Sequence, residues 1–299
     1  MSSSPATGIF LLVASMGAFS LSDALVQYAG SSLPPAQLAW LRYSLLLLTV
    51  LPLLARQPRL WRSSRPWVQV GRALGLVGSA LLFLQGLKSL PIADATALVF
   101  ASPLYVTVLS VLLLREPFSL IRAIPVLMGF VGVLIIALPG QMQFNPAVLY
   151  PMSSSLGWAA AVICTRLLGN SDSAITTMLY SSALGVVVLT PPSGTAQLAA
   201  VIAHWPALLA MAACWCAAQW LVVLAYRHAP PASIAPFSYS QLLWAGLLGW
   251  ALFGHLPSTR TAIGMALILV SGCLAAWMTR RSVTNPAGHG DKQSATKPC

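Results

Sequence analysis

The amino-acid sequence predicts an all-α membrane protein whose ten transmembrane helices form two inverted five-helix repeats. Three observations lead to this fold class. The 299 residues are 58% apolar and only 7% charged, whereas soluble domains carry about 25% charged residues. Ten apolar runs each come near the roughly 20 residues that cross the hydrocarbon of a bilayer. Finally, two long stretches that lie 139 residues apart share a residue pattern.

The ten apolar runs follow one another through short connections, which leave no room for a soluble domain. Their expected bounds are 8–29, 35–54, 68–87, 92–113, 121–139, 146–168, 174–191, 204–226, 232–253 and 260–278. We expect residues 1–140 to form the first five-helix repeat and residues 141–279 the second. Residues 280–299 are polar and contain Gly and Pro, a composition that is typical of a disordered tail.

The basic residues indicate how the chain is oriented in the membrane. Sixteen Lys and Arg against five Asp and Glu give a net charge of +11. Because these basic residues lie between apolar runs, we expect a membrane surface and not nucleic acid beside them. With the N-terminus inside, thirteen basic residues, Arg72 among them, fall on the inner side and three, Arg42, Lys88 and Arg260, on the outer side. Cytoplasmic loops are enriched in Lys and Arg, so both termini should be cytoplasmic.

The internal repeat pairs LKSLPIADATALVFASPLYVTVLSVLLLREP (87–117) with YRHAPPASIAPFSYSQLLWAGLLGWALFGHLP (226–257). A shift of 139 residues pairs Lys88 with Arg227 and Tyr105 with Trp244. Each half then holds five spans. Because five is odd, the second half enters the membrane from the opposite side, and such inverted repeats are typical of secondary transporters.

This twice-repeated pattern resembles the EamA-type members of the drug/metabolite transporter superfamily. The pattern is a basic residue, a Pro, an apolar span and then a Gly-containing span. The stretches SLSDALVQ in the first span and LAWLRYSLLLL in the second resemble the family as well. The similarity covers the chain outside its tail, with two departures. His255 stands where the family usually has Glu, and Gln27 where members of this subgroup often have Lys.

The resemblance implies a ten-span secondary carrier in the bacterial inner membrane, with membrane lipids and a small-molecule substrate as its partners. We expect it to move an amino acid or a related amphiphilic solute by alternating access. The alternative is a carrier of a riboflavin-like vitamin or of drugs. The family implies no cofactor, and the sequence is compatible with a monomer.

Other classes of protein have little support in the sequence. The chain has no GxSxG, no HExxH and no paired carboxylates, so an intramembrane enzyme would lack acid–base groups. A lipid scramblase or a structural membrane protein would not need an inverted repeat. Four of the five cysteines lie inside apolar runs and none forms a CxxC, which argues against a metal site.

Asp23 and Arg42 are the charged residues that stand out inside the first two spans. Each lies roughly 9–10 Å from the outer end of its helix at 1.5 Å per residue. The two spans are consecutive and antiparallel, so the side chains should lie at the same depth and form a salt bridge. Such a pair could fix the two helices together, form an outer gate, or contact the charged groups of a zwitterion. Because Arg42 would hold Asp23 ionised, we expect solute flow or exchange rather than proton coupling.

The fourth and ninth spans are predicted to line a central cavity. Ser102 and Tyr105 share one helical face of the fourth span, and Phe237, Gln241 and Trp244 share the matching face of the ninth. Pro103 and Pro236 should loosen the helices beside these faces. Aromatic walls with a few polar groups suit a small amphiphilic solute. The complete set of expected substrate-binding residues is Asp23, Arg42, Ser102, Tyr105, Trp158, Tyr180, Gln219, Phe237, Gln241 and Trp244.

Overall fold

A computed structural model describes residues 5–29, 33–115, 120–137, 145–169, 171–193, 198–229 and 234–284. All the regular structure in these ranges is helical. Six stretches are long and apolar enough to cross a membrane, namely Ala6–Tyr28, Pro35–Arg56, Pro66–Leu87, Ile92–Leu114, Pro146–Leu168 and His204–His228. Shorter apolar helices cover Ala123–Ala137, Ala174–Thr190 and Thr259–Ala275. With Ala235–Phe253, the described residues contain the ten expected spans.

The helix bounds agree with the expected spans to within a few residues at most ends. The first half contains α1 (Pro5–Ala29), α2 (Pro35–Arg56), the 3₁₀ helix η1 (Pro58–Trp61), α3 (Pro66–Leu87), α4 (Ile92–Val99), α5 (Ser102–Leu114) and α6 (Leu120–Ala137). The second half contains η2 (Pro146–Val148), α7 (Leu149–Leu168), α8 (Ala174–Ser193), α9 (Leu198–His228), η3 (Ala235–Tyr239), α11 (Ser240–Phe253) and α12 (Thr259–Thr284). The last helix continues five residues into the expected tail, and residues 285–299 lie outside the described ranges.

The fourth and ninth spans depart from regular α-helix near their prolines, as expected. The fourth span is divided into α4 and α5, and α5 starts one residue before Pro103. The ninth span begins as the 3₁₀ helix η3, which contains Pro236, and continues as α11. Proline lacks the N–H that an α-helix needs and clashes with the preceding turn. The backbone is therefore irregular at corresponding points of the two halves.

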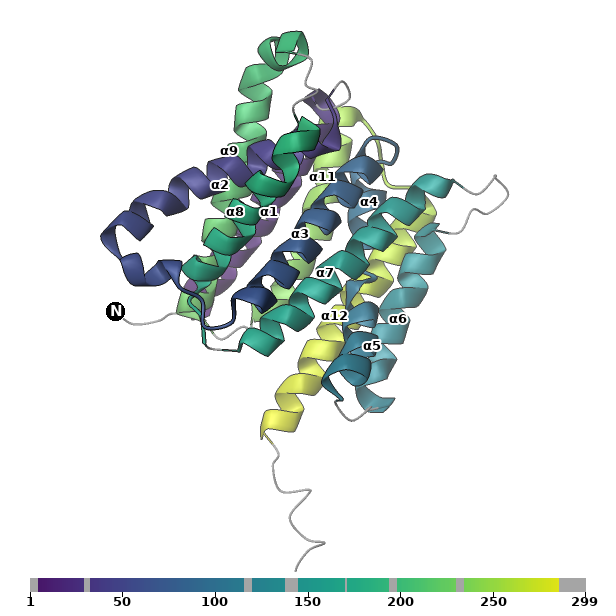
Figure 1. The fold of residues 1–299 in the computed structure, drawn as a ribbon. Helices are drawn as coiled ribbons and strands as arrows, with labels where there is room; N and C mark the ends of the chain where they lie inside the picture. Colours follow the sequence, from purple (N-terminus) through teal and green to yellow (C-terminus); the bar gives the residue numbers. More distant parts are fainter. Residues whose placement is uncertain are drawn as a thin grey trace, which may run out of the picture.

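The helix contacts follow a two-fold pattern between the halves. α1 packs on α9 and α3 on α7, which are corresponding pairs of spans. In addition α2 contacts α8, α4 contacts α11 and α6 contacts α12, so each of these spans meets its own counterpart. α1 begins and α12 ends toward the lower side of the bundle in Figure 1. We name that side the proximal face and the opposite side, where α1 ends, the distal face.

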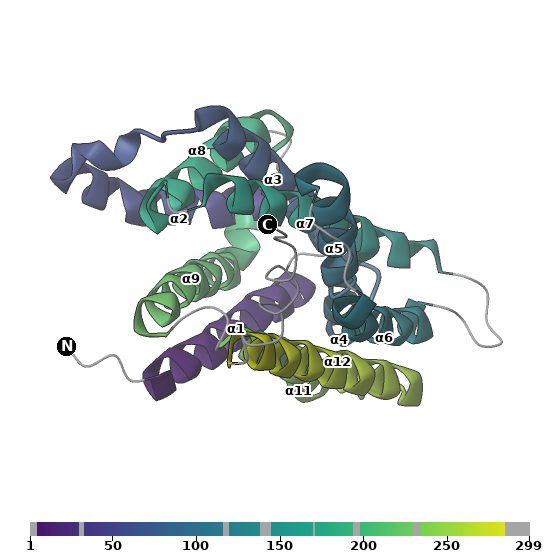
Figure 2. The ribbon, with the colours of Figure 1, turned by 90° about the horizontal axis from the view of Figure 1, so that it is seen from below.

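Seen from below, the bundle has two sides (Figure 2). α2, α8, α3 and α7 lie on one side, whereas α1, α11 and α12 lie on the other, with α9 beside α1. The main apolar core includes Leu38 on α2, Leu98 on α4 and Met211 on α9, all fully buried. It therefore joins the two sides of the bundle.

Glycines permit the closest helix contacts. A Cβ added to Gly157 of α7 would lie 2.9 Å from the carbonyl oxygen of Gly75 of α3, and a Cβ on Gly75 would lie 2.8 Å from the carbonyl oxygen of Gly157. Gly132 of α6 and Gly264 of α12 approach each other in the same way. Because lipid provides no hydrophobic force between helices, small residues that let backbones pack closely stabilise membrane bundles.

Asp172 ties two connections together at the proximal face. Its carboxylate accepts hydrogen bonds from the Ser63 hydroxyl, from the Ser64 N–H and hydroxyl at 3.0 and 2.9 Å, and from the Gln69 amide at 2.8 Å. Burial alone would raise the pKa of Asp172, but these donors favour the ionised form and lower the pKa from 3.8 to about 2. The connection after α2 is thus held to the connection after α7.

Adding a methyl group at Gly157 should separate α3 from α7. We expect Gly157→Ala to lower stability by about 1–3 kcal/mol, the usual cost of overpacking. Gly78→Ala on α3 is the control, because its Cβ would meet nothing within 4 Å and alanine favours a helix by about 1 kcal/mol over glycine. Thermal unfolding in detergent measures both. Equal Tm values for the two variants would show that the α3–α7 contact is loose.

Replacing Asp172 with Asn should lower stability at neutral pH, because a neutral amide is a weaker acceptor for these four donors. A carboxyl with a lowered pKa stabilises the fold fully above 3.8 and loses this contribution as the pH falls through about 2. The Tm difference between the native chain and Asp172→Asn should therefore be largest at pH 7 and shrink toward pH 2. A difference that stays constant with pH would contradict this role of the carboxylate.

Candidate functional site

The salt bridge expected between the first two spans is present. Arg42 Nη2 lies 2.9 Å from Asp23 Oδ1, and both side chains are about 5% exposed. It is the one ion pair within the described ranges. A charge inside a membrane is costly unless it is paired, and the pair removes this cost for both helices. The Nε of Arg42 is also buried and has no hydrogen-bond partner in the described part of the chain.

A polar stripe on α1 continues on both sides of Asp23. Ser20, Asp23 and Gln27 are spaced by three and four residues, so they share one helix face. Ser20 donates to the carbonyl oxygen of Gln241 on α11 at 3.3 Å. Gln27 Nε2 donates to the carbonyl oxygens of Leu87 at 3.2 Å and Leu90 at 2.6 Å. The stripe therefore touches α11, α2 and the α3–α4 connection at successive depths.

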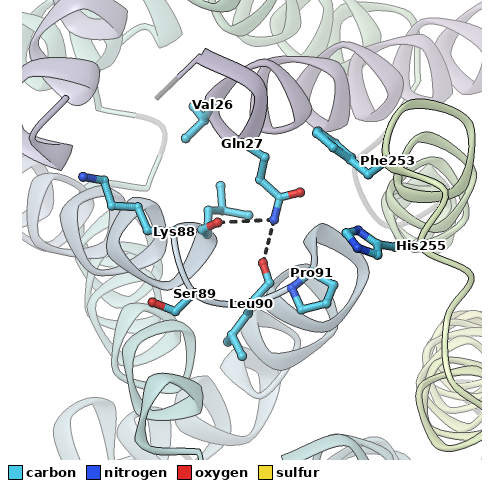
Figure 3. Close-up of a pocket in the computed structure, with 9 residues that line it drawn as sticks. Val26, Gln27, Lys88, Ser89, Leu90, Pro91, Phe253 and His255 are labelled. Carbon is cyan, nitrogen blue, oxygen red and sulfur yellow. Dashed lines mark hydrogen bonds between the residues drawn. The ribbon is translucent and has the colours of Figure 1, made fainter. Parts of the chain in front are cut away.

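A pocket of about 330 Å³ opens beside Gln27 at the distal face. Figure 3 shows the Gln27 amide between α1 and the α3–α4 connection, with Phe253 and His255 on the opposite wall. The lining residues are Val26, Gln27, Leu87, Lys88, Ser89, Leu90, Pro91, Phe253 and His255. The Lys88 ammonium points away from Gln27 (Figure 3), and partial burial lowers its pKa. Apolar walls with a few polar groups are typical of sites for small organic molecules, and the amide, imidazole and hydroxyl here supply both donors and acceptors.

Below the ion pair, Tyr43 of α2 extends the polar interior. Its ring is 3% exposed, meets Trp215 of α9 edge-on with centroids 5.3 Å apart, and packs against Gly185 of α8. α2 of the first half and α8 and α9 of the second thus meet around this aromatic side chain.

Arg72, which the sequence places at the inner start of the third span, points into this interior. Its Nε donates to Thr165 of α7 at 2.8 Å, and its Nη1 donates to Ser181 of α8 at 2.6 Å. Both partners are neutral hydroxyls, and no carboxylate pairs with Arg72 within the described residues. The missed signal is its depth, since Arg72 stands six residues inside α3, as Asp23 stands six residues inside the other end of α1.

The two repeat-equivalent faces meet through residues other than those expected. Phe100 and Tyr239 stack with centroids 5.0 Å apart at 27°. They are 139 residues apart, so they are counterparts in the repeat and lie at the pseudo-two-fold axis. Ser102 and Tyr105 are half-buried on α5, just beyond this stack. A small cavity of about 40 Å³ borders Phe100 and Tyr239.

The other expected site residues lie in several different places. Trp244 and Gln241 lie against α1, where the Trp244 indole donates to the carbonyl oxygen of Val13 at 3.2 Å and its ring covers Gly17. Phe237 is 37% exposed, and Gln219 is half-buried.

Among the described residues, no hydrogen bond or ring stacking joins Trp158 or Tyr180 to the Tyr43–Trp215 pair or to the Phe100–Tyr239 stack. Trp158 is 48% exposed on α7, and the Tyr180 hydroxyl donates to the carbonyl oxygen of Trp61 in η1 at 3.5 Å. In the described part of the chain no three His, Cys, Asp or Glu residues gather as a metal site.

Comparison with known proteins places this geometry in a family. The sequence profile described as the EamA-like transporter family matches residues 6–138 and 145–277. The two matched segments begin 139 residues apart, the shift at which the internal repeat aligns. A solved crystal structure shares the fold with a TM-score of 0.62 at 21% identity, covering 93% of this chain and 99% of that one.

Curated relatives span nearly the whole chain. A riboflavin transporter of Vibrio cholerae is 28% identical over 93% of this chain and 96% of its own length. A riboflavin transporter of Rhizobium johnstonii is 32% identical over 84% and 85%. An S-adenosylmethionine uptake transporter of Rickettsia bellii is 26% identical over 88% and 90%. The protein is thus an integral membrane protein and a secondary transporter of small metabolites, not an enzyme, and it belongs to the EamA-like transporter family.

Proposed function

We propose that the protein carries riboflavin or a closely similar planar, amphiphilic metabolite across the bacterial inner membrane. The observation that supports this most directly is the 32% identity to a riboflavin transporter over 84% of the chain, together with the similar match to the riboflavin transporter of Vibrio cholerae. Two of the three relatives named above are riboflavin transporters, and the third takes up S-adenosylmethionine, a nucleoside derivative of an amino acid. They favour the vitamin alternative over the amino-acid substrate that the sequence led us to expect.

The interior chemistry fits such a solute. A flavin has a wide planar ring with polar edges and a hydroxylated chain. Tyr43, Trp215 and Trp244 present aromatic surface along the interior, and ring stacking on such surface contributes about 0.5–1.5 kcal/mol per pair. Arg72 contributes guanidinium N–H groups that can donate hydrogen bonds to a ring carbonyl oxygen of the flavin. Ser102 and Gln241 contribute polar groups on the two helices next to the Phe100–Tyr239 stack.

Transport follows from the repeat. Two similar halves with opposite orientation give two packings of comparable energy, one open at each face, and the solute site stays near the middle of the membrane. The irregular backbone between α4 and α5 and in η3 lies at corresponding points where the halves meet. With the termini cytoplasmic, as the basic residues predict, the distal face is the outer face.

The Asp23–Arg42 pair serves in this scheme as part of the outer gate. It lies at the distal end of the polar interior and joins α1 to α2. A flavin does not carry the paired ammonium and carboxylate groups that would make this ion pair a zwitterion site. The unpartnered Nε of Arg42 leaves one donor for a passing solute.

Purified protein in liposomes should take up labelled riboflavin. We expect uptake above that of protein-free liposomes, inhibition by unlabelled riboflavin, and no inhibition by a mixture of the common amino acids. Measured flavin in the liposome lumen gives the result directly. Inhibition of uptake by amino acids would refute the proposed substrate. So would the absence of riboflavin movement both into and out of the liposomes.

Breaking the ion pair should destabilise the protein, and exchanging its charges should separate its two roles. Removing one partner of a buried pair costs about 3–5 kcal/mol, so Asp23→Ala and Arg42→Ala should each give a low yield of folded protein. The double exchange Asp23→Arg with Arg42→Asp keeps the pair, and we expect it to restore the yield.

Riboflavin uptake by the double variant then tests the gate. If the pair is a gate, it needs Arg42 Nε on α2 and Asp23 on α1. We therefore expect riboflavin uptake by the double variant to stay at least about tenfold below that of the native protein. This factor corresponds to about 1.4 kcal/mol in the transport barrier. Native uptake together with native yield would show that the pair only holds the two helices together.

A further inference from the structure

Gln27 joins α1 to the α3–α4 connection directly above the buried ion pair. Its amide donates to the carbonyl oxygens of Leu87 and Leu90 at 3.2 and 2.6 Å. Gln27 follows Asp23 by four residues, one helical turn toward the distal face. Beyond Gln27 lies the distal pocket, and below Gln27 lie Asp23 and then Ser20, which are 4% and 1% exposed.

We propose that the distal pocket is the outer vestibule of the solute path and that Gln27 is a latch that closes the passage from this vestibule to the ion pair. The latch rests on the proposed transport function. Gln27 is a suitable latch because it holds a backbone connection and not a side chain. When its two hydrogen bonds break, α1 separates from the α3–α4 connection, and the face of α1 that carries Asp23 and Ser20 becomes open to the vestibule.

The vestibule also has a chemical preference. None of its nine lining residues is acidic, and two of them, Lys88 and His255, are basic. Phe253 and His255 hold their rings nearly parallel, at 19° with centroids 6.4 Å apart, and Figure 3 shows both on the wall facing the Gln27 amide. Aromatic surface opposite an amide, without a counter-charge for cations, suits neutral or anionic planar solutes.

The second repeat has a different arrangement at the corresponding place. The shift of 139 residues relates Gln27 to Arg166, near the proximal end of α7, and Arg166 donates to Ser110 of α5 at 2.9 Å. The contacts of Arg166 thus include a side-chain hydroxyl on α5, whereas Gln27 contacts backbone carbonyl oxygens of the α3–α4 connection. A carrier that closes one face at a time can have different contacts at corresponding positions of its two halves.

The latch can be tested by the access of a reagent to Ser20. In a background without native cysteines, Ser20→Cys places a thiol below both the latch and the ion pair. A membrane-impermeant, charged methanethiosulfonate is added to the distal face of intact cells, and its rate of reaction is measured. We expect slow labelling with native Gln27 and labelling about tenfold faster with Gln27→Ala, the factor that matches about 1.4 kcal/mol from the lost hydrogen bonds.

Two further variants separate a latch from a general loosening of the protein. Gln27→Lys keeps a donor for the two carbonyl oxygens, since an ammonium has three N–H groups, and it should restore slow labelling. Gln57→Ala, an exposed glutamine at the proximal face, should leave the rate unchanged. Equal rates in the native, Gln27→Ala and Gln27→Lys proteins, with full labelling after denaturation, would overturn the latch.

The vestibule is tested by protection in the Gln27→Ala background. Riboflavin and flavin mononucleotide should slow the labelling of Ser20→Cys, whereas the cationic S-adenosylmethionine should not. Protection by S-adenosylmethionine alone, or by none of the three, would overturn the assignment of the vestibule. The latch result needs no solute, so a failure of riboflavin transport and a failure of the latch are distinguishable.

Hydrogen–deuterium exchange provides a second measurement should Ser20→Cys not fold. With native Ser20, the amides of residues 87–90 should exchange faster in Gln27→Ala than in Gln27→Lys. Equal exchange in the two proteins would contradict the latch.

Discussion

The hydrocarbon of the bilayer offers no water to polar groups, so every charge inside this bundle must find a partner within the protein. The Asp23–Arg42 pair meets this requirement at the distal side, where each side chain is about 5% exposed. Arg72 meets it with neutral hydroxyls from α7 and α8. The ion pair joins α1 to α2, and Arg72 joins α3 to α7 and α8.

The pseudo-two-fold relation underlies the proposed solute path. Phe100 and Tyr239 are counterparts in the repeat and stack on each other, so they mark the axis about which the two halves exchange roles. The backbone is irregular beside this stack, because α4 ends just before Phe100, α5 begins at Ser102, and Tyr239 ends the 3₁₀ helix η3. The stripe Ser20, Asp23 and Gln27 leads from this region to the distal pocket. The proposed path therefore follows one face of α1.

The fold could be predicted from the sequence because length and hydropathy alone define a membrane span, and the odd number of spans per half then fixes the inversion. The Asp23–Arg42 contact could be predicted as well, since two consecutive antiparallel helices place residues at equal distances from their shared connection at equal depth. Neither inference needs knowledge of how distant helices pack.

The rest of the site depends on that packing. Arg72 was counted only among the basic residues of the inner side, because the sequence does not show the hydroxyls that it meets on α7 and α8, some 90 to 110 residues later in the chain. Helical spacing correctly grouped Ser102 with Tyr105, but it could not show that Phe100 would meet Tyr239 instead. Tyr180 was expected in the cavity, yet its hydroxyl binds the Trp61 carbonyl oxygen near the proximal face.

Pulsed electron paramagnetic resonance tests the central claim, that the two inverted halves open opposite faces in turn. Spin labels at Tyr28 and Lys88 report on the distal face, and labels at their repeat counterparts Leu167 and Arg227 report on the proximal face. All four positions are exposed. The account predicts that adding riboflavin changes the two distances in opposite directions, one lengthening as the other shortens. Distances that change together, or that do not respond to any transported solute, would contradict it.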